Sequence, residues 1–507
     1  MDAWAALAAG RIADAERAFG ALLVREPANA DALAGLARAF SARGDRLAAA
    51  GAARRAAALA PDRLDAQLLL ADLLRDVGNF ADAIAPLERA RFLAPADSRI
   101  AARLADAYRL TARADDAFAV ANAALDREPD AVELLVASGF AALALDRLDL
   151  ADERFCAALA RDARAHGAIR GRALVANERA AWSDADGFFA EALAIAPDDP
   201  DARFGRAVLD LRFGRVRAGW AGFGAIVDTE IDRARYYYLL CGVPLWDGGP
   251  LRGRRLLVSS SHGLGDHLMM ARFFARLPTD GAVTIESPPE LIALFRRSFP
   301  TLRFVVREPL QSPASMDVHM PVMNLPHALG VADESDLRSE PYLRADPAVV
   351  ARHRAAFARE PGVRHIGIAW HGNPKNRRER WRTAPLSHWA PLAALADVRF
   401  HALHVAVSDD ELRDAPFPLE RHTLPDMEAT AALVAALDGV VTVDTSIVHL
   451  AGALGVPTWL ANPRHSDFRW GIERPDSPWY PSVRIVAQPE AATWDPVFPM
   501  IARSLVR

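Results

Sequence analysis

Small and helix-ending residues recur along the first half of the chain at a fixed step of 34 residues. The first position of the pattern holds Gly10, Gly44, Gly78, Ala112, Asp146, Ala180 and Gly214. Five residues later stand Ala15, Ala49, Ala83, Ala117, Ala151, Ala185 and Gly219, and twelve further on stand Pro27, Pro61, Pro95, Pro129, Ala163 and Pro197. The pattern predicts stacked pairs of helices: the first position ends one helix, the small residue lies where two helices cross, and the proline ends the second helix.

This period and these residue types resemble the tetratricopeptide (TPR) repeat. The resemblance implies an α-solenoid over residues 1–229, with about seven repeats of which the first is truncated. Arrays of this kind bind a segment of another protein on their concave face. The residues alone leave one alternative open, an alanine-rich helical bundle in which the spacing arises by chance.

The pattern changes after the last repeat. Residues 230–250 are predicted to form a cap and linker, with a helix over 230–242 and a turn-rich stretch from Val243 to Leu251. From Arg255 onward, short apolar runs predict strands at 255–260, 282–286, 303–306, 365–370, 398–404, 439–443 and 458–460. Helices are predicted between them at 266–277, 289–298, 385–396, 428–437 and 446–454.

Strands that alternate with helices indicate parallel α/β sheets. The length of this part is enough for two lobes, predicted at 251–345 and 346–507, with a hinge in the proline- and acid-rich stretch from Ala332 to Ala348. The expected fold class is therefore α plus α/β: an α-solenoid followed by two Rossmann-like lobes.

Three segments that follow predicted strands can carry chemistry, because ligands of open α/β sheets bind at the carboxyl ends of the strands. The first is Ser259-Ser-Ser-His-Gly-Leu-Gly-Asp-His267. Gly263 and Gly265 would let the backbone approach a ligand, and Asp266 would stand at a helix start. The alternative for Asp266 is an ordinary helix-capping role.

The second segment runs from Ile368 to Arg382 and includes Trp370, Gly372, Asn373 and several cations, among them Lys375 and Arg382. Such a group of cations suits a diphosphate. A solvated basic loop is the alternative.

The third segment is Val441-Thr-Val-Asp-Thr-Ser-Ile-Val-His449. A buried strand leads into Asp444, and a helix begins at Thr445 and Ser446, so that its free amides and its dipole can hold an anion. His449 lies about one turn inside that helix. The alternative is a capping aspartate and a core histidine.

Four stretches together resemble bacterial TPR-fused glycosyltransferases: Gly-Leu-Gly-Asp at 263–266, Trp-x-Gly-Asn-Pro at 370–374, the segment at 443–455, and Asp-Ser-Pro-Trp-Tyr-Pro at 476–481. The catalytic half is similar to the heptosyltransferases and more distantly to the O-GlcNAc transferases, both of the GT-B fold. Among the TPR-fused members are enzymes that modify flagellin.

The resemblance implies an inverting glycosyltransferase that needs no metal or cofactor and uses a nucleotide-sugar as co-substrate. Asp444, Thr445, Ser446 and His449 match the segment that holds the donor phosphates. Arg382 stands at the position of the basic residue that neutralises the leaving phosphate. The implied protein partner is an acceptor Ser or Thr substrate on the concave face of the array, with flagellin as the leading choice.

The identity of the general base stays open among three residues. Asp266 matches an aspartate proposed as base in the heptosyltransferases. The neighbouring positions depart from that family, since His262 and His267 stand where Gln and Thr are usual, and a histidine can itself act as base. Two other functions also stay open: transfer to a lipid or saccharide, and a non-catalytic scaffold with a degenerate transferase fold.

Composition excludes other classes. The formal net charge of -5 does not suggest nucleic-acid binding, and no apolar stretch is long enough for a membrane span. The 2 cysteines have no zinc or redox spacing and fit a reducing compartment. The expected location is the cytoplasm.

Overall fold

The computed structural model describes residues 2–229, 242–260, 262–306, 315–373, 379–489 and 493–506. The predicted helix at 230–242, apart from its last residue, and Lys375 lie outside these ranges. The chain divides into two compact units, Met1–Arg206 with Gly224–Pro244, and Ala207–Phe223 with Leu245–Arg507. Each unit is described in turn.

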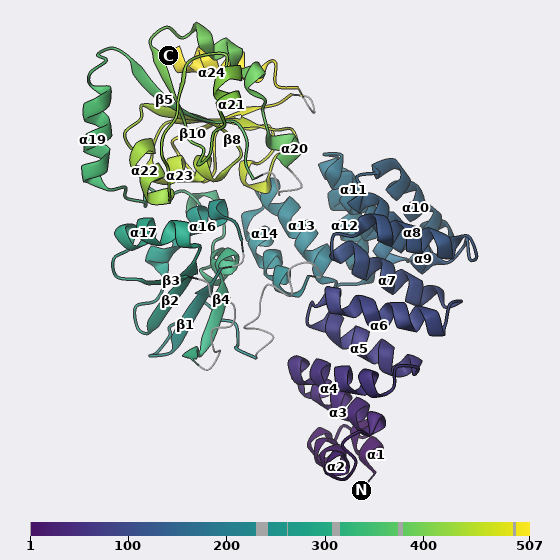
Figure 1. Cartoon of the computed structure of the whole chain (residues 1–507). Helices are drawn as coiled ribbons and strands as arrows, with labels where there is room; N and C mark the ends of the chain where they lie inside the picture. The colour runs from purple at the N-terminus through teal and green to yellow at the C-terminus, as the bar shows by residue number, and fades with distance from the viewer. Residues whose placement is uncertain are drawn as a thin grey trace. The chain divides into compact units, whose positions relative to one another are not determined.

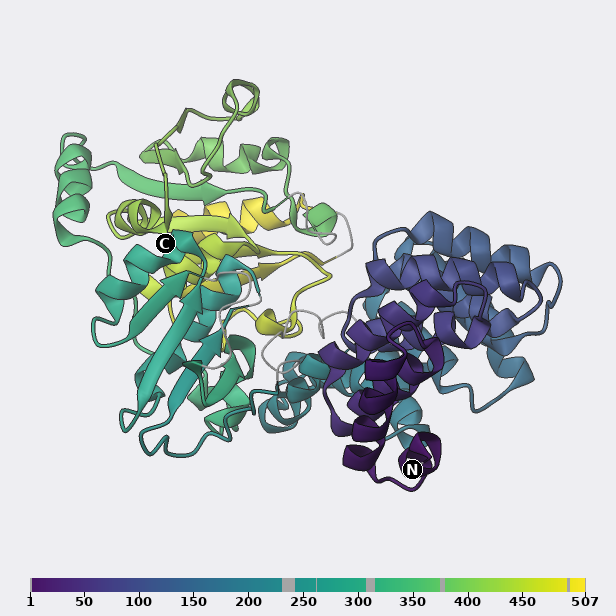
Figure 2. The same cartoon turned by 60° about the horizontal axis from the view of Figure 1, so that its bottom comes forward.

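The N-terminal unit is built from helices in consecutive pairs, coloured from purple to blue in Figures 1 and 2. Their bounds are α1 Ala3–Ala8, α2 Ile12–Arg25, α3 Ala30–Arg43, α4 Arg46–Leu59, α5 Leu64–Asp76, α6 Phe80–Leu93, α7 Ser98–Leu110, α8 Ala114–Leu125, α9 Val132–Ala144, α10 Leu148–Arg161, α11 His166–Glu178, α12 Trp182–Ile195 and α13 Pro200–Arg212. Each pair matches one 34-residue repeat, so the predicted TPR-like solenoid is confirmed. The first helix is short, as the sequence predicts.

The turn inside each pair has a left-handed residue at the predicted position. The backbone angle φ is positive at Gly10, Gly44, Gly78 and Gly214, and also at Ala112 (62°), Asp146 (63°) and Ala180 (56°). Glycine adopts this conformation without strain, whereas alanine and aspartate do not. The repeat geometry therefore holds even where glycine is missing.

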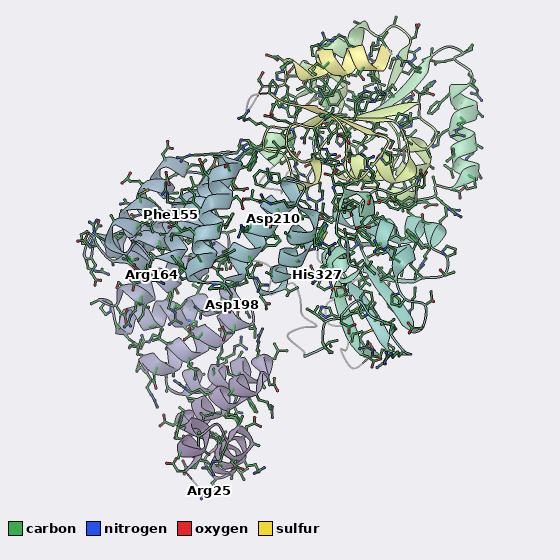
Figure 3. The ribbon with its side chains drawn as sticks, turned by 180° about the vertical axis from the view of Figure 1, so that it is seen from behind. Arg25, Phe155, Arg164, Asp198, Asp210 and His327 are labelled. Carbon is green, nitrogen blue, oxygen red and sulfur yellow. The ribbon has the colours of Figure 1, made fainter. Side chains whose placement is uncertain are left out.

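The small residues of the pattern lie at the helix crossings. Ala15, Ala49, Ala117, Ala151 and Ala185 are fully buried. Phenylalanines fill the remaining space beside glycines: a Cβ atom on Gly171 would lie 2.3 Å from the ring of Phe155, which is labelled in Figure 3. The core of the array is therefore made of alternating small and large side chains.

The last helix of the pattern, α14 (Val216–Phe223), belongs to the second unit with the end of α13. Trp220 on α14 is fully buried and contacts Phe468 and Trp479, with ring centroids 6.2 Å apart in both pairs. The boundary between the two compact units therefore falls inside the seventh repeat, not at residue 229 as the period suggests. The reason is that aromatic side chains pack α14 against the C-terminal core.

Two parallel sheets form the rest of the second unit. The first contains β1 Arg255–Ser259, β2 Ala282–Ser287, β3 Arg303–Val306 and β4 Val318–Pro321, in the order β3-β2-β1-β4. The connecting segments include α16 Leu264–Met270, the 3-10 turns η3 Ala271–Arg276 and η5 Val322–Asn324, α17 Pro289–Ser298 and α18 Leu325–Ala328.

The second sheet contains β5 Arg364–Ala369, β6 Val398–Ala402, β7 Leu419–Glu420, β8 Gly439–Val443, β9 Thr458–Asn462 and β10 Val483–Ala487. Its order is β10-β9-β8-β5-β6-β7, the order of a Rossmann-type doubly wound sheet. Its helices are α19 Pro347–Phe357, α20 Glu379–Arg382, α21 Asp409–Asp414, α22 Met427–Val434, α23 Ser446–Leu454 and α24 Val497–Val506, with 3-10 turns η7 Leu386–Ala394 and η8 Phe468–Trp470.

All seven predicted strands are present within two residues of their predicted ends, but β4, β7 and β10 were not predicted. Two predicted helices differ in type. The helix expected at 385–396 is a 3-10 segment containing Pro391, and the one expected at 266–277 becomes 3-10 after Met270. Among the described residues no helix has both the length and the apolar character needed to cross a membrane.

Candidate functional site

A cavity of about 700 Å³ lies in the second unit, where strands of both sheets end. Its walls come mainly from the segments after β1, β5, β6, β8 and β9. In each sheet these include the point where the strand order reverses, between β1 and β4 and between β5 and β8, which is where open parallel sheets bind ligands. The topology alone therefore explains the position of the cavity.

The helix α23 begins at the cavity wall. Thr445 caps this helix, and its hydroxyl accepts a hydrogen bond from the N–H of Ile447 at 3.2 Å. Its first turn has N–H groups without intrahelical acceptors, and the positive end of the helix dipole points in the same direction. This helix end therefore favours an anion.

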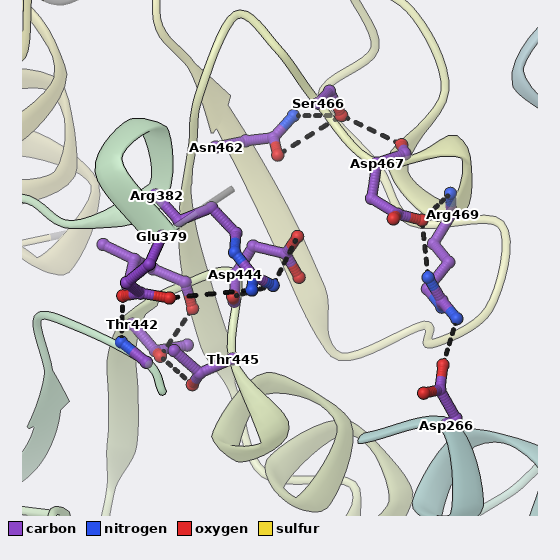
Figure 4. A network of polar contacts seen from close by, with 12 residues as sticks. Asp266, Glu379, Arg382, Thr442, Asp444, Thr445, Asn462, Ser466, Asp467 and Arg469 are labelled. Atoms are coloured by element: carbon purple, nitrogen blue, oxygen red, sulfur yellow. Dashed lines mark hydrogen bonds and ion pairs between the residues drawn. The ribbon is translucent and has the colours of Figure 1, made fainter. Parts of the chain in front are cut away.

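Arg382 lies beside that helix end (Figure 4). Its guanidinium donates to the backbone oxygen of Asp444 at 3.1 Å and lies 3.7 Å from the Asp444 carboxylate and 3.6 Å from that of Glu379. Burial raises the pKa of Asp444 above its ordinary value, although Arg382 opposes this effect. The carboxylates of Asp444 and Glu379 thus hold the Arg382 guanidinium beside the N-terminus of α23.

Asp266 is held by a second arginine that the sequence did not single out. Arg469 forms an ion pair with Asp266 and donates to Asp467 at 2.6 Å (Figure 4). The Asp266 carboxylate also accepts the Gly263 N–H at 3.0 Å. Burial would raise the pKa of Asp266, but the positive charge of Arg469 is the largest of the effects that outweigh it and hold this pKa below its usual range. Asp266 is therefore ionised at neutral pH.

Helices α16 and α23 approach each other closely at the cavity wall, through Gly265 on α16 and His449 on α23. The His449 ring lies 3.0 Å from the Tyr480 hydroxyl through Nδ1 and stacks on Trp470. A Cβ on Gly265 would lie 2.9 Å from the His449 ring, so α16 can approach α23 only with glycine at this position. Burial and the charge of Arg469 lower the pKa of His449 to about 3, which leaves the ring neutral.

Most of the residues predicted for the site line this cavity: Gly263, Gly265, Asp266, Gly372, Asn373, Arg382, Asp444, Thr445, Ser446 and His449. Trp370 does not, because its ring is buried in the core beside His404. His267 is fully buried with its Nε2 2.7 Å from the Ser260 hydroxyl, away from the cavity wall, and this position does not suit a general base. His262 lies near Asp266 but is not part of the cavity wall.

Five polar residues of the wall were missed: His371, His404, His465, Asp467 and Arg469. His371 and His404 stack with ring centroids 4.0 Å apart, and the backbone N–H of Trp370 donates to Nε2 of His404. Asp467 and Arg469 follow β9, so the rule that ligands bind where strands end could have found them. This signal is weak because neither a glycine-rich motif nor an α-helix follows β9 before β10 begins.

The array has a cavity of its own, of about 640 Å³, lined by the first helices of three consecutive repeats, α7, α9 and α11, and by the loop before α11. Five arginines and three acidic residues line it. Near its centre the Phe140 ring has the guanidinium carbons of Arg109 and Arg170 at 5.2 and 5.3 Å from its centroid. Arg164, labelled in Figure 3, is an exposed member of the same wall.

These features define a class: a TPR-like helical array joined to a unit with two parallel α/β sheets and a polar cleft, lined by arginines and aspartates, where strands end. No family model matches the chain. The chain is 28% identical over 346 residues to Protein FlbA of Caulobacter vibrioides, an overlap that covers 62% of this chain and 57% of FlbA. The chain therefore spans less than two thirds of the length of this relative.

Among solved structures, the chain is similar to MamA with 20% identity and a TM-score of 0.30, over 32% of this chain and 88% of MamA. It is similar to PilW, a type IV pilus biogenesis factor, with 16% identity and a TM-score of 0.31, over 40% of this chain and 97% of PilW. YrrB, a TPR protein with a peptide-binding site, gives 16% identity and a TM-score of 0.28, over 36% of this chain and 95% of YrrB.

Proposed function

We propose that this protein is an inverting glycosyltransferase that moves a sugar from a nucleotide-sugar donor to a Ser or Thr of a protein acceptor recruited by the TPR-like array. The observation that carries the proposal is the convergence of the α23 N-terminus, Arg382, Arg469 and Asp266 on one cavity. In this proposal the two sheets are the lobes of a GT-B transferase, and the resemblance of the 443–455 segment supports that assignment.

Two positive groups suit the leaving diphosphate. The N-terminus of α23 offers backbone donors, and Arg382 offers a planar guanidinium that can bind two phosphate oxygens. Charge that develops on the leaving oxygen as the glycosidic bond breaks is stabilised by donors already in position. In this proposal Arg382 and the N-terminus of α23 supply the positive charge that stabilises the departing diphosphate.

Asp266 is the proposed general base. Its carboxylate is ionised at neutral pH and lies at the cavity wall, so it can accept the proton of the acceptor hydroxyl as that oxygen attacks the anomeric carbon. Arg469 orients the carboxylate through the ion pair. His449 also lines the cavity with a neutral ring, but its Nδ1 is engaged by Tyr480. His262 remains a second candidate because of its position near Asp266.

The acceptor is proposed to bind on the array, with flagellin as the leading candidate. The arginine-rich cavity of α7, α9 and α11 suits an acceptor segment that carries acidic side chains beside its Ser or Thr. YrrB, whose structure contains a peptide-binding site, illustrates this use of a TPR protein.

The test uses the full chain and a panel of UDP, GDP, ADP, CDP and CMP in a thermal-shift measurement. The matching nucleotide should raise the melting temperature, since saturation at 100 times Kd adds about 2.7 kcal/mol of stability. The corresponding nucleotide-sugars are then incubated, together with flagellin as protein acceptor, with the wild type and with Asp266→Asn. The proposal predicts nucleotide release by the wild type and at least a ~100-fold slower release by Asp266→Asn with nucleotide binding retained. Absence of binding by every nucleotide would favour the non-catalytic scaffold.

A further inference from the structure

A cluster formed by His401, Glu420 and His422 lies on the second sheet at β6 and β7, and none of these three residues lines the cleft. His401 on β6 and Glu420 on β7 are register partners on adjacent parallel strands, so their side chains share one face of the sheet. His422 follows β7 by two residues. The three side chains therefore meet at the edge of the sheet, since β7 is its outermost strand.

The distances bring three ligand atoms together. Nδ1 of His401 lies 2.9 Å from Nε2 of His422 and 3.4 Å from Oε2 of Glu420. All three ligand atoms lie within 4.8 Å of one another. A tetrahedral zinc ion with Zn–N bonds of 2.0–2.1 Å separates neighbouring ligands by about 3.3 Å. A shift of about 0.4 Å between the two imidazoles would thus admit the ion.

Neighbouring side chains fix the orientation of the His401 ring. Its other ring nitrogen, Nε2, lies 2.9 Å from Nδ1 of His365. The His365 ring is held in turn by stacking on Phe357 of α19, with centroids 4.1 Å apart. Histidines that bind metals usually have their second nitrogen fixed by such a hydrogen bond, which sets the tautomer and the ring orientation.

The cluster is also open to solvent and offers the ligand types that zinc prefers. His401 is fully buried, whereas the Glu420 side chain is 51% exposed, which gives an ion a route from solvent. Two imidazoles and one carboxylate are ligands that zinc prefers, whereas calcium and magnesium prefer oxygen ligands alone.

We propose that His401, Glu420 and His422 form a zinc site at the sheet edge, independent of the sugar-transfer cleft. Three protein ligands leave a fourth position for water. The ion would join β7, a strand of only two residues, to the buried strand β6. The proposal rests on a second feature of the molecule and stands whether or not the cleft binds a nucleotide.

The experiment titrates ZnCl₂ into the full chain, prepared without a histidine tag and freed of metal with a chelator, by isothermal titration calorimetry. We expect one ion per chain and a melting temperature that rises with zinc. Co²⁺ as a second probe should give the visible absorption of a tetrahedral site. His422→Ala and Glu420→Gln change partly exposed positions and should weaken zinc binding at least 10-fold.

His388→Ala is the matched control, because His388 is a partly exposed histidine that pairs with Asp495 elsewhere in the same unit. It should bind zinc as the wild type does. Absence of saturable zinc binding, or equal affinity in the wild type and His422→Ala, would overturn the proposal and leave the cluster as a chain of hydrogen-bonded histidines.

Discussion

Asp266 and Asp444 line the same cavity but respond to it in opposite ways. Both carboxylates lose water on burial, which favours the protonated form. For Asp266 the ion pair with Arg469 outweighs this effect, whereas for Asp444 the more distant Arg382 does not. The surroundings of Asp266 therefore stabilise its ionised form, whereas burial shifts Asp444 toward its protonated form.

The two residues should consequently give opposite pH dependences of stability. A depressed pKa adds stability above the unfolded value of about 3.9, and this stability is lost as the pH falls through the folded pKa. A raised pKa reduces stability as the pH rises through the folded pKa. Asp266→Asn should therefore lower the melting temperature at pH 7 but not near pH 2. Asp444→Asn should become more stable relative to the wild type as the pH rises from 4 to 8.

Thermal unfolding of the full chain across this pH range measures both differences. Parallel curves for the two variants would contradict the assignment of opposite shifts.

Gly265 offers a test of the close contact between α16 and α23. A Cβ at this position would lie 2.9 Å from the His449 ring and 3.6 Å from Cα of Ser446. Gly265→Ala should therefore cost about 1–3 kcal/mol of unfolding free energy by overpacking and weaken nucleotide binding. Gly263→Ala is the control, since its Cβ would meet only the Asp266 carboxylate at 3.5 Å. Equal denaturant midpoints for the two variants would show that the contact has no energetic weight.

Site residues that follow predicted strands could be predicted from the sequence. Site residues that are placed by contacts between segments far apart in the chain could not. Asp444 and Arg382 follow β8 and β5 directly or closely in the chain, so strand prediction placed them together. Arg469 reaches Asp266 across 203 positions of sequence, a pairing that no local pattern contains. His267 shows the opposite error: a polar residue near a motif lies in the core because its ring bonds with Ser260.

At the scale of elements, substitutions in the turns of the array test the cost of backbone strain apart from the effect of side-chain packing. Ala112 and Ala180 have positive φ, which costs an L-residue about 1–2 kcal/mol. Ala112→Gly and Ala180→Gly should each raise the unfolding free energy by roughly 0.5–1 kcal/mol, after the entropy lost by glycine is subtracted. Urea denaturation measures the change.

Two controls accompany this prediction. Ala196→Gly changes a helix end with φ of -129°, and should be neutral or destabilising. Gly44→Ala introduces a Cβ that meets nothing within 4 Å, so it should cost about 1 kcal/mol through φ alone. Destabilisation by Ala112→Gly would refute the strain argument.

Element types were predictable where the pattern was long and periodic. The 34-residue period repeats a local signal many times, and the helix pairs follow it. Strands such as β4 and β7 contain only four and two residues, and they form because a neighbouring strand already offers hydrogen-bonding groups. Short strands depend on their partners more than on their own residues.

At the scale of the whole molecule, the proposed division of labour between array and cleft makes a separate prediction. Reversing two exposed charges of the array cavity, Arg99→Glu with Arg164→Glu, should reduce sugar transfer to protein acceptors by about 5–10-fold, since each exposed contact is worth roughly 0.5–0.7 kcal/mol. Binding of the nucleotide to the cleft should not change, because neither substitution touches its lining residues. Arg25→Glu is the control on the same array (Figure 3). Full transfer by the double variant would exclude this cavity as the acceptor site.

The most direct test of the account measures nucleotide binding to the full chain by calorimetry, using the nucleoside diphosphate that stabilises the protein best. Arg382→Ala and Arg469→Ala each remove a cation of the cleft, whereas Arg338→Ala removes an exposed cation of the same unit outside it. Loss of a charged hydrogen bond costs about 1.5–3 kcal/mol, so Kd should rise at least ~10-fold in Arg382→Ala. Kd should also rise in Arg469→Ala, which removes a nearby positive charge, and stay unchanged in Arg338→Ala. Equal affinity in all three variants and the wild type would contradict a phosphate-binding cleft at α23.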